Sequence, residues 1–159
     1  MVNTRKHKPA GAGHSSFSLV DPGKVFGELT LKSGSIFLDV ACGRGEYAIA
    51  ASSNVGGKGL VYAINLWEEG IAALSKKALA MGIRNLKTLV GDVSKGIPIE
   101  DATVDVCLMA TVLHDLVQEG VADGALKEAA RVLKARSLLA VIEFKNVEGA
   151  HLDLPSISG

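Results

Sequence analysis

The chain has 159 residues, of which 48% are hydrophobic and 21% charged, and its 17 basic and 17 acidic side chains give a formal net charge of zero. This length predicts one domain with enough apolar residues for a packed core, and the neutral balance gives no basic surface for nucleic acid or an acidic membrane. No apolar run approaches the roughly 20 residues of a membrane span, and no signal-peptide core follows the basic N-terminus, so we expect a cytoplasmic protein.

The chain reads as alternating strands and helices. Residues 1–14 are polar, basic and rich in glycine, and we predict a flexible N-terminal segment over residues 1–20. Apolar runs between turn residues predict five strands, at residues 36–40, 60–64, 86–90, 104–110 and 138–144. Amphipathic stretches and capping residues predict four helices, at residues 21–29, 46–54, 68–81 and 123–134.

Several of these strands are apolar on both faces, which is typical of a parallel sheet covered by helices on both sides. The sequence therefore predicts one α/β domain over residues 21–145, followed by a short tail at residues 146–159.

The most informative stretch is the end of the first predicted strand. Asp39 closes an apolar run, Gly43 and Gly45 follow in a loop of small residues, and a helix begins at Glu46. Glycines let a ligand lie against the backbone, and the helix start directs free N–H groups toward the loop. This strand, glycine loop and helix predict a nucleotide-cofactor site, since a glycine turn alone does not need Asp39.

Polar or glycine residues follow the other strands at the same edge of the predicted sheet. Asn65 to Trp67 follow the second strand, Gly91-Asp92-Val93 the third, and Ala110 with His114 the fourth. Ligands of open parallel sheets bind outside the carboxyl ends of the strands. We therefore expect these residues to surround one ligand.

The order and spacing of these segments resemble class I S-adenosylmethionine (SAM) dependent methyltransferases, in particular the type 11 group, from about residue 21 to about residue 145. The resemblance rests on the segments 39–45, 61–65, 90–98, 101–114 and 128–134. It implies a Rossmann-like, doubly wound and mostly parallel sheet of strand order 3-2-1-4-5. It also implies SAM as cofactor and S-adenosylhomocysteine as its product.

The resemblance also implies residue roles. Gly43 and Gly45, within the loop that includes Ala41 and Cys42, would lie under the methionine part of SAM, and Asp39 would hold the loop and the ammonium environment. Asn65 would face the ribose, and Leu66 and Trp67 would lie near the adenine. Asp92 would accept from the adenine amino group, the Val93 N–H would donate to the ring, and Ala110 would offer its carbonyl to the ammonium group.

Simpler interpretations stay open for some of these residues. Asp92 is also suited to cap a turn, and Trp67 to be an ordinary half-buried aromatic. Asp105 begins the fourth predicted strand at its far end, where a structural role is expected. Cys42 and Cys107 show no metal-ligand spacing, so we expect no metal site and two small buried side chains, with a catalytic thiol as the alternative.

Two departures from the family pattern matter. Asn65 stands where the family usually has an acid on both ribose hydroxyls, so we expect SAM binding weaker by about 1–2 kcal/mol, the scale of one charge-assisted bond. The family usually continues past the fifth strand with a helix and two further strands, which the residues after Phe144 are too few to form. We therefore expect an exposed apolar edge at the fifth strand, and a homodimer through it or a folded-back tail. A shortened chain and a naturally minimal protein fit the sequence equally well.

Three functional classes compete. The first is a SAM-dependent methyltransferase acting on a small molecule, with His114 as a candidate general base, although packing against or capping the following helix is the other role open to His114. The second is a SAM-binding or interaction protein without catalysis. The third is a nicotinamide dehydrogenase, because Gly43 to Ala48 fit the G-x-G-x-x-A pattern. Asp39, the Gly91-Asp92 loop, the lack of a second domain and the lack of a Tyr-x-x-x-Lys pair count against the third class.

Overall fold

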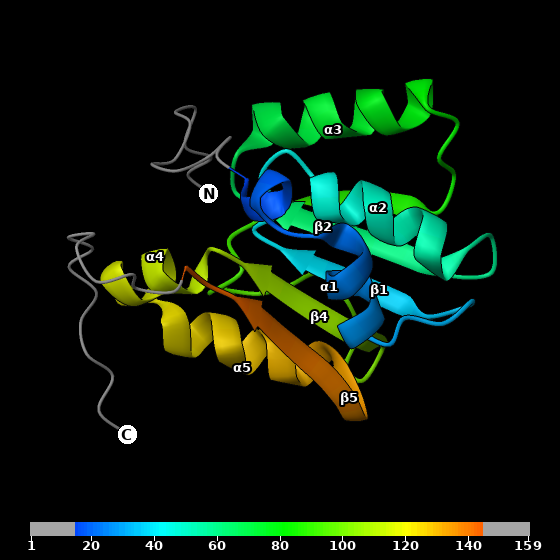
Figure 1. The fold of residues 1–159 in the computed structure, drawn as a ribbon. Coiled ribbons are helices and arrows are strands. Elements are labelled where there is room, and N and C mark those ends of the chain that lie inside the picture. The colour runs from blue at the N-terminus through cyan, green and yellow to red at the C-terminus, as the bar shows by residue number, and fades with distance from the viewer. Residues whose placement is uncertain (1–14, 145–159) are drawn as a thin grey trace.

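A computed structural model describes residues 15–144 of the chain (Figure 1). Its centre is a five-stranded, all-parallel sheet of order β3-β2-β1-β4-β5. The strands are β1 (Ile36–Val40), β2 (Leu60–Asn65), β3 (Leu86–Val90), β4 (Val104–Ala110) and β5 (Leu133–Ile142). The predicted fold class and strand order are confirmed.

Helices cover both faces of this sheet (Figure 1). They are η1 (Ser16–Leu19), α1 (Pro22–Glu28), α2 (Glu46–Val55), α3 (Glu68–Ala80), α4 (Leu113–Gln118) and α5 (Ala122–Val132). One buried cluster joins α1, α2 and α3 to one face of the sheet, and a second cluster joins α4, α5 and the segment 93–99 to the other. None of the helices within residues 15–144 is long and apolar enough to cross a membrane.

Local sequence signals explain where α1 begins and where α3 ends. The Asp21 carboxylate accepts hydrogen bonds from the N–H groups of Gly23 and Lys24, and Pro22 occupies the first turn of α1. At the end of α3, Gly82 has φ 73° and the next N–H, that of Ile83, donates to the Ala78 carbonyl at 2.9 Å. This C-terminal motif favours glycine, and it stops α3 where the sequence predicted.

The N-terminal boundary differs from the expectation. The segment predicted to be flexible up to residue 20 already contains η1, and Ser16 in it is buried with its hydroxyl 2.8 Å from the Tyr47 hydroxyl. Phe17 adds an edge-on contact to the Tyr47 ring, with the centroids 5.0 Å apart. Residues 16–19 therefore belong to the packed domain, because a long-range contact with α2 holds them. Residues 1–14 and 145–159 lie outside the described range.

The start of β5 is the second correction. We expected a helix to residue 134 and a strand from residue 138, but α5 ends at Val132 and β5 begins at Leu133. Leu133 pairs with Val104, and regular pairing resumes at Leu138 opposite Val106, so the chain between them bulges. Arg136 in this bulge has φ 62°. Residues 134–137 contain no proline or glycine that would separate helix from strand, and pairing with β4 extends β5 back to the end of the helix.

Candidate functional site

The predicted cofactor residues all lie at one edge of the sheet, where the parallel strands end (Figure 1). Backbone hydrogen bonds tie the loops together there: the Cys42 N–H donates to the Ile64 carbonyl, and the Gly91 N–H donates to the Asn65 carbonyl, both at 3.0 Å. The chain order reverses between β1 and β4, which makes this edge the topological switch point.

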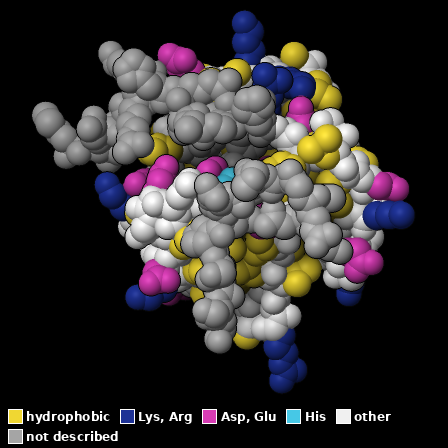
Figure 2. Space-filling view, turned by 60° about the vertical axis from the view of Figure 1, so that its left-hand side comes forward, with side chains coloured by type: hydrophobic (Ala, Val, Ile, Leu, Met, Phe, Trp, Pro, Cys, Tyr) yellow, Lys and Arg dark blue, Asp and Glu magenta, His cyan; other side chains and the backbone are white. Residues whose placement is uncertain are grey.

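Figure 2 looks toward this edge of the molecule. Hydrophobic side chains gather in the middle of the visible face, and acidic side chains and a histidine are visible near them. The face therefore offers apolar area and carboxylates together.

The two loop glycines, Gly43 and Gly45, differ in their surroundings. Both have positive φ, 53° at Gly43 and 76° at Gly45. A Cβ added at Gly43 would meet no atom of residues 15–144 within 4 Å, whereas a Cβ at Gly45 would lie 2.4 Å from Leu74 side-chain atoms. Gly43 thus leaves open space beside the backbone for a ligand, and Gly45 allows the loop to pack closely against α3. Ala41, just before them, also has a positive φ of 54°.

Asp39 is the buried charge of the site. It is 2% exposed, and its Oδ2 has no hydrogen-bond partner among the described residues. Burial raises the pKa of this carboxyl to about 7, while the Ala48 backbone N–H in the first turn of α2 acts in the opposite direction. A buried carboxylate oxygen with no partner is what a cationic ligand group, such as an ammonium, would satisfy.

Asn65 lies at the end of β2 and is buried. Its Oδ1 accepts the Trp67 N–H at 3.4 Å, so the side chain shapes the turn and its Nδ2 side is what remains for a ligand. Leu66 and Trp67 follow at this edge, both half-buried. A Cβ on Gly70 would lie 2.2 Å from the Trp67 ring, so the indole packs closely against α3 at Gly70.

Asp92 has the turn-capping role that the sequence left open. Its Oδ1 accepts the Ser94 N–H at 3.0 Å and the Ser94 hydroxyl at 2.6 Å, and its Oδ2 lies 3.8 Å from the exposed Lys95 ammonium. The Val93 side chain is buried in the cluster beneath α5. What Asp92 can still offer to an adenine is therefore Oδ2.

Thr111 lies at the same edge, directly after Ala110 at the end of β4. Its φ is 53°, which is unusual for a β-branched residue, and its hydroxyl donates to the Ala110 carbonyl at 2.8 Å. The Ala110 carbonyl, predicted for the ligand ammonium, thus already has one donor and keeps one lone pair.

His114 is the second residue of α4, a helix that the sequence analysis did not delimit. Its imidazole Nδ1 lies 2.9 Å from Glu143 Oε2, and its Nε2 lies 3.3 Å from Asp115 Oδ1. The sequence analysis missed Glu143, although an acid that closes an apolar strand was the signal that identified Asp39.

The cysteines do not have the properties of nucleophiles. Burial, with a further contribution from the nearby Asp39, raises the pKa of the Cys42 thiol well above its usual range and that of Cys107 to about 12. A nucleophilic cysteine needs a lowered pKa, so the catalytic-thiol alternative has no support here. Within residues 15–144, no three His, Cys, Asp or Glu side chains are grouped so that they could hold a metal ion.

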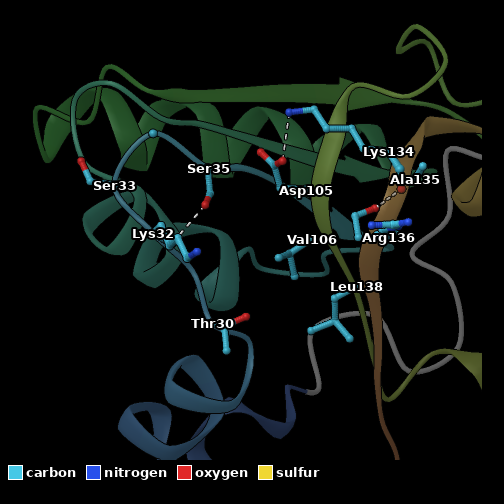
Figure 3. A pocket seen from close by; sticks show the side chains of 12 residues that line it. Thr30, Lys32, Ser33, Ser35, Asp105, Val106, Lys134, Ala135, Arg136 and Leu138 are labelled. Carbon is cyan, nitrogen blue, oxygen red and sulfur yellow. Dashed lines mark hydrogen bonds and ion pairs between the residues drawn. The ribbon is translucent and has the colours of Figure 1, made fainter.

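A hollow of about 500 Å³ lies at the opposite edge, where β1, β4 and β5 begin (Figure 3). Asp105 lines it and accepts the Ile36 N–H at 2.8 Å and the Lys134 ammonium at 2.9 Å, and these bonds lower the pKa of the carboxyl despite partial burial. This ties β4 to β1 and β5, which is the structural role expected of Asp105. The hollow is not part of the predicted cofactor site.

A glycine loop and a buried carboxyl, one oxygen of which has no partner among the described residues, lie at the switch point of a doubly wound parallel sheet, which is the arrangement typical of Rossmann-like domains. Comparison with known proteins identifies the family. The profile of the family described as "Methyltransferase domain" matches residues 37–136. A solved SAM-dependent methyltransferase from Aquifex aeolicus is 37% identical, with a TM-score of 0.75, and the match covers 84% of this chain and 69% of that one.

Among curated proteins, the demethylmenaquinone methyltransferase of Staphylococcus aureus is 32% identical over 120 residues, which are 76% of this chain. The chain spans about half the length of the curated relatives that it matches, 47% in this case. The cyclase SpnF shares the fold, with a TM-score of 0.68 at 24% identity, and the match covers 77% of this chain and 43% of that one. This chain belongs to the methyltransferase domain family.

Proposed function

We propose that this chain binds SAM at the edge where β1 to β4 end and takes part in methyl transfer to a small molecule. The observation that carries the proposal is the pair formed by Gly43 and Asp39. No described atom lies within 4 Å of a Cβ added at Gly43, and Asp39, near the end of β1 and four residues before Gly43, has a buried carboxylate oxygen with no hydrogen-bond partner among the described residues. These residues fit a ligand that carries a cationic ammonium group close to the backbone.

The surrounding residues would then hold the rest of the molecule. Asn65 would meet the ribose through its Nδ2 side, Leu66 and Trp67 would border the adenine, and Asp92 Oδ2 would accept from the adenine amino group. The Ala110 carbonyl would share the ammonium group with Asp39. SAM supplies a methyl group already activated by its sulfonium, so the protein's main work is to align the acceptor.

A SAM-binding protein without catalysis is the second candidate, and Asn65 is the observation that favours it. An amide gives the ribose fewer charge-assisted bonds than the acid usual in the family. The dehydrogenase alternative has less support, since an anionic dinucleotide would bring negative charge toward the buried carboxyl of Asp39.

For the acceptor, we propose an aromatic quinol as the first class to test, because the S. aureus relative is named for demethylmenaquinone. A nucleophile of this kind loses a proton on methylation, which His114 at the same edge is suited to accept. The formal net charge of zero favours a small molecule over nucleic acid as the acceptor. We place the reaction in the cytoplasm.

Calorimetric titration of the purified chain with SAM, S-adenosylhomocysteine and NAD tests this proposal. We expect binding of the first two and none of NAD. NAD binding without SAM binding would overturn the proposal. Binding of SAM with no transfer to a soluble demethylmenaquinone analogue would favour the non-catalytic candidate for that acceptor.

A further inference from the structure

Glu143 makes two contacts with one residue far away in sequence. Its Oε1 accepts the His114 backbone N–H at 3.3 Å, and its Oε2 lies 2.9 Å from the His114 Nδ1. One carboxylate therefore holds both the backbone and the ring of His114. Each side chain is 32% exposed, so the imidazole is held by these contacts while one part of it stays open to solvent.

The sheet register sets this juxtaposition. Ala110 at the end of β4 pairs with Ile142 at the end of β5, and the Thr111 N–H donates to the Ile142 carbonyl at 2.6 Å. Glu143 is the next residue after Ile142, and His114 follows Thr111 by three positions. Because the two strand ends are locked together, the carboxylate meets the ring without depending on a flexible loop.

The contact has a chemical consequence for the ring. A carboxylate beside Nδ1 accepts the N–H there and so favours the Nδ1–H tautomer, which leaves the lone pair on Nε2. Among the described residues, the charged side chains in contact with the imidazole nitrogens are Glu143, which follows β5, and Asp115 on α4 itself. Asp115 Oδ1 lies 3.3 Å from Nε2, where it would stabilise the ring after Nε2 has gained a proton.

We infer that Glu143 is a positioning residue that holds His114 with Nε2 as the general base, and that the methyl acceptor is therefore a nucleophile that must lose a proton, such as a hydroxyl. The acceptor's proton passes to Nε2 while its electron pair forms the bond to the methyl carbon, and the electron pair of the broken carbon–sulfur bond stays on sulfur. The catalytic part of this inference rests on the proposed function, whereas the tautomer does not.

The first experiment reads the tautomer directly. Long-range ¹H–¹⁵N spectra of the labelled chain report which ring nitrogen carries the proton, and the His114→Gln spectrum assigns the signal among the four histidines. We expect Nδ1–H in the wild type at a pH where the ring is neutral, and a shift to the Nε2–H pattern in Glu143→Ala. Asp115→Asn, which removes the other carboxylate, is expected to keep the Nδ1–H pattern.

An Nε2–H ring in the wild type, or a pattern unchanged in Glu143→Ala, overturns the inference. A thermal melt of each variant tests whether it is folded. Glu143→Asp is the conservative control, and partial Nδ1–H character in the folded Glu143→Asp chain supports the positioning role. S-adenosylhomocysteine titration separates the two claims: we expect unchanged affinity in Glu143→Ala. If the wild type binds neither SAM nor S-adenosylhomocysteine, the proposed function fails and the catalytic part of the inference fails with it, while the spectra still decide the tautomer.

Discussion

At the scale of single residues, the glycine loop separates ligand binding from packing. Among the described residues Gly43 borders open space and Gly45 borders Leu74, so substitutions at the two positions should have different effects. Gly45→Ala would meet the Leu74 side chain at a φ of 76°, and we expect it to lower the free energy of unfolding by about 2–4 kcal/mol. Urea unfolding monitored by circular dichroism measures this loss.

Gly43→Val is the matched change for the ligand. We expect it to abolish binding of SAM, because the side chain would occupy the space beside the loop, and to strain the backbone at φ 53° without a contact to any described atom within 4 Å of the new Cβ. Calorimetry on the folded variant checks this. Retained binding in Gly43→Val would place the ligand elsewhere.

Asp39 predicts a pH dependence of both stability and binding. Its folded pKa of about 7 lies above the reference value of 3.8, so the folded chain binds more protons than the unfolded chain between these values. The stabilising contribution is therefore complete below about pH 4 and is lost as the pH rises to about 7. Asp39→Asn should remove this decline, which urea unfolding across the pH range measures.

Binding should show the opposite trend to stability. A cationic ligand prefers the ionised carboxylate, so affinity for S-adenosylhomocysteine is expected to rise from about pH 6 to pH 8 with release of a proton. Calorimetry in buffers of different ionisation enthalpy detects that proton. Equal proton release in Asp39→Asn would assign the effect to another group.

Asn65 predicts a gain of affinity. In Asn65→Asp the Oδ1 contact to the Trp67 N–H can remain, while the second carboxylate oxygen replaces Nδ2 as an acceptor for ribose hydroxyls. We expect SAM binding tighter by about 1–2 kcal/mol, and an unliganded fold that is less stable because the new charge is buried. An affinity that stays the same or falls would show that Asn65 does not face the ribose.

At the scale of elements, the junction of α5 and β5 carries local strain. Arg136 adopts φ 62° in the bulge, a conformation that favours glycine, and it lines the hollow at the amino-terminal edge (Figure 3). Arg136→Gly should raise the free energy of unfolding by about 1 kcal/mol, because glycine adopts this conformation without steric cost. Ala135→Gly is the control: its φ is not positive, so it should be destabilising. A stability loss in Arg136→Gly would mean that the side chain contributes more than the strain costs.

At the scale of the whole molecule, β5 ends the described sheet as expected. It has a strand neighbour on one side among the described residues, and Leu138 and Val141 on it are 38% and 42% exposed. Such an edge can pair with another strand, so we predict self-association that increases with protein concentration. Multi-angle light scattering checks the mass. Val141→Lys should reduce the measured mass, since a charge on the edge opposes pairing. A stable wild-type monomer, with the same mass in Val141→Lys, would contradict the prediction.

Much of the fold was predictable because its signals are local. β1, β3 and β4 have the bounds expected from their apolar runs, and Asp21 and Gly82 mark helix ends by hydrogen bonds within a few residues. The cofactor edge was predictable for a related reason. In a parallel sheet the residues after each strand share one edge, so the motif order alone places Asp39, Asn65, Asp92 and Ala110 together.

Tertiary structure decided what depends on partners distant in sequence. The early start of β5 follows from pairing with β4, and the order in η1 follows from the Ser16–Tyr47 contact. Because Ser94 donates to Asp92 Oδ1, the Asp92 atom that stays available for a ligand is Oδ2. The meeting of His114 with Glu143 depends on the β4–β5 register, which no local pattern specifies. The sequence by itself determined the α/β fold class and the edge at which we propose that the cofactor binds, because these follow from periodicity and turn chemistry. Which atoms remain available at that edge depends on contacts that form only when the sheet is assembled.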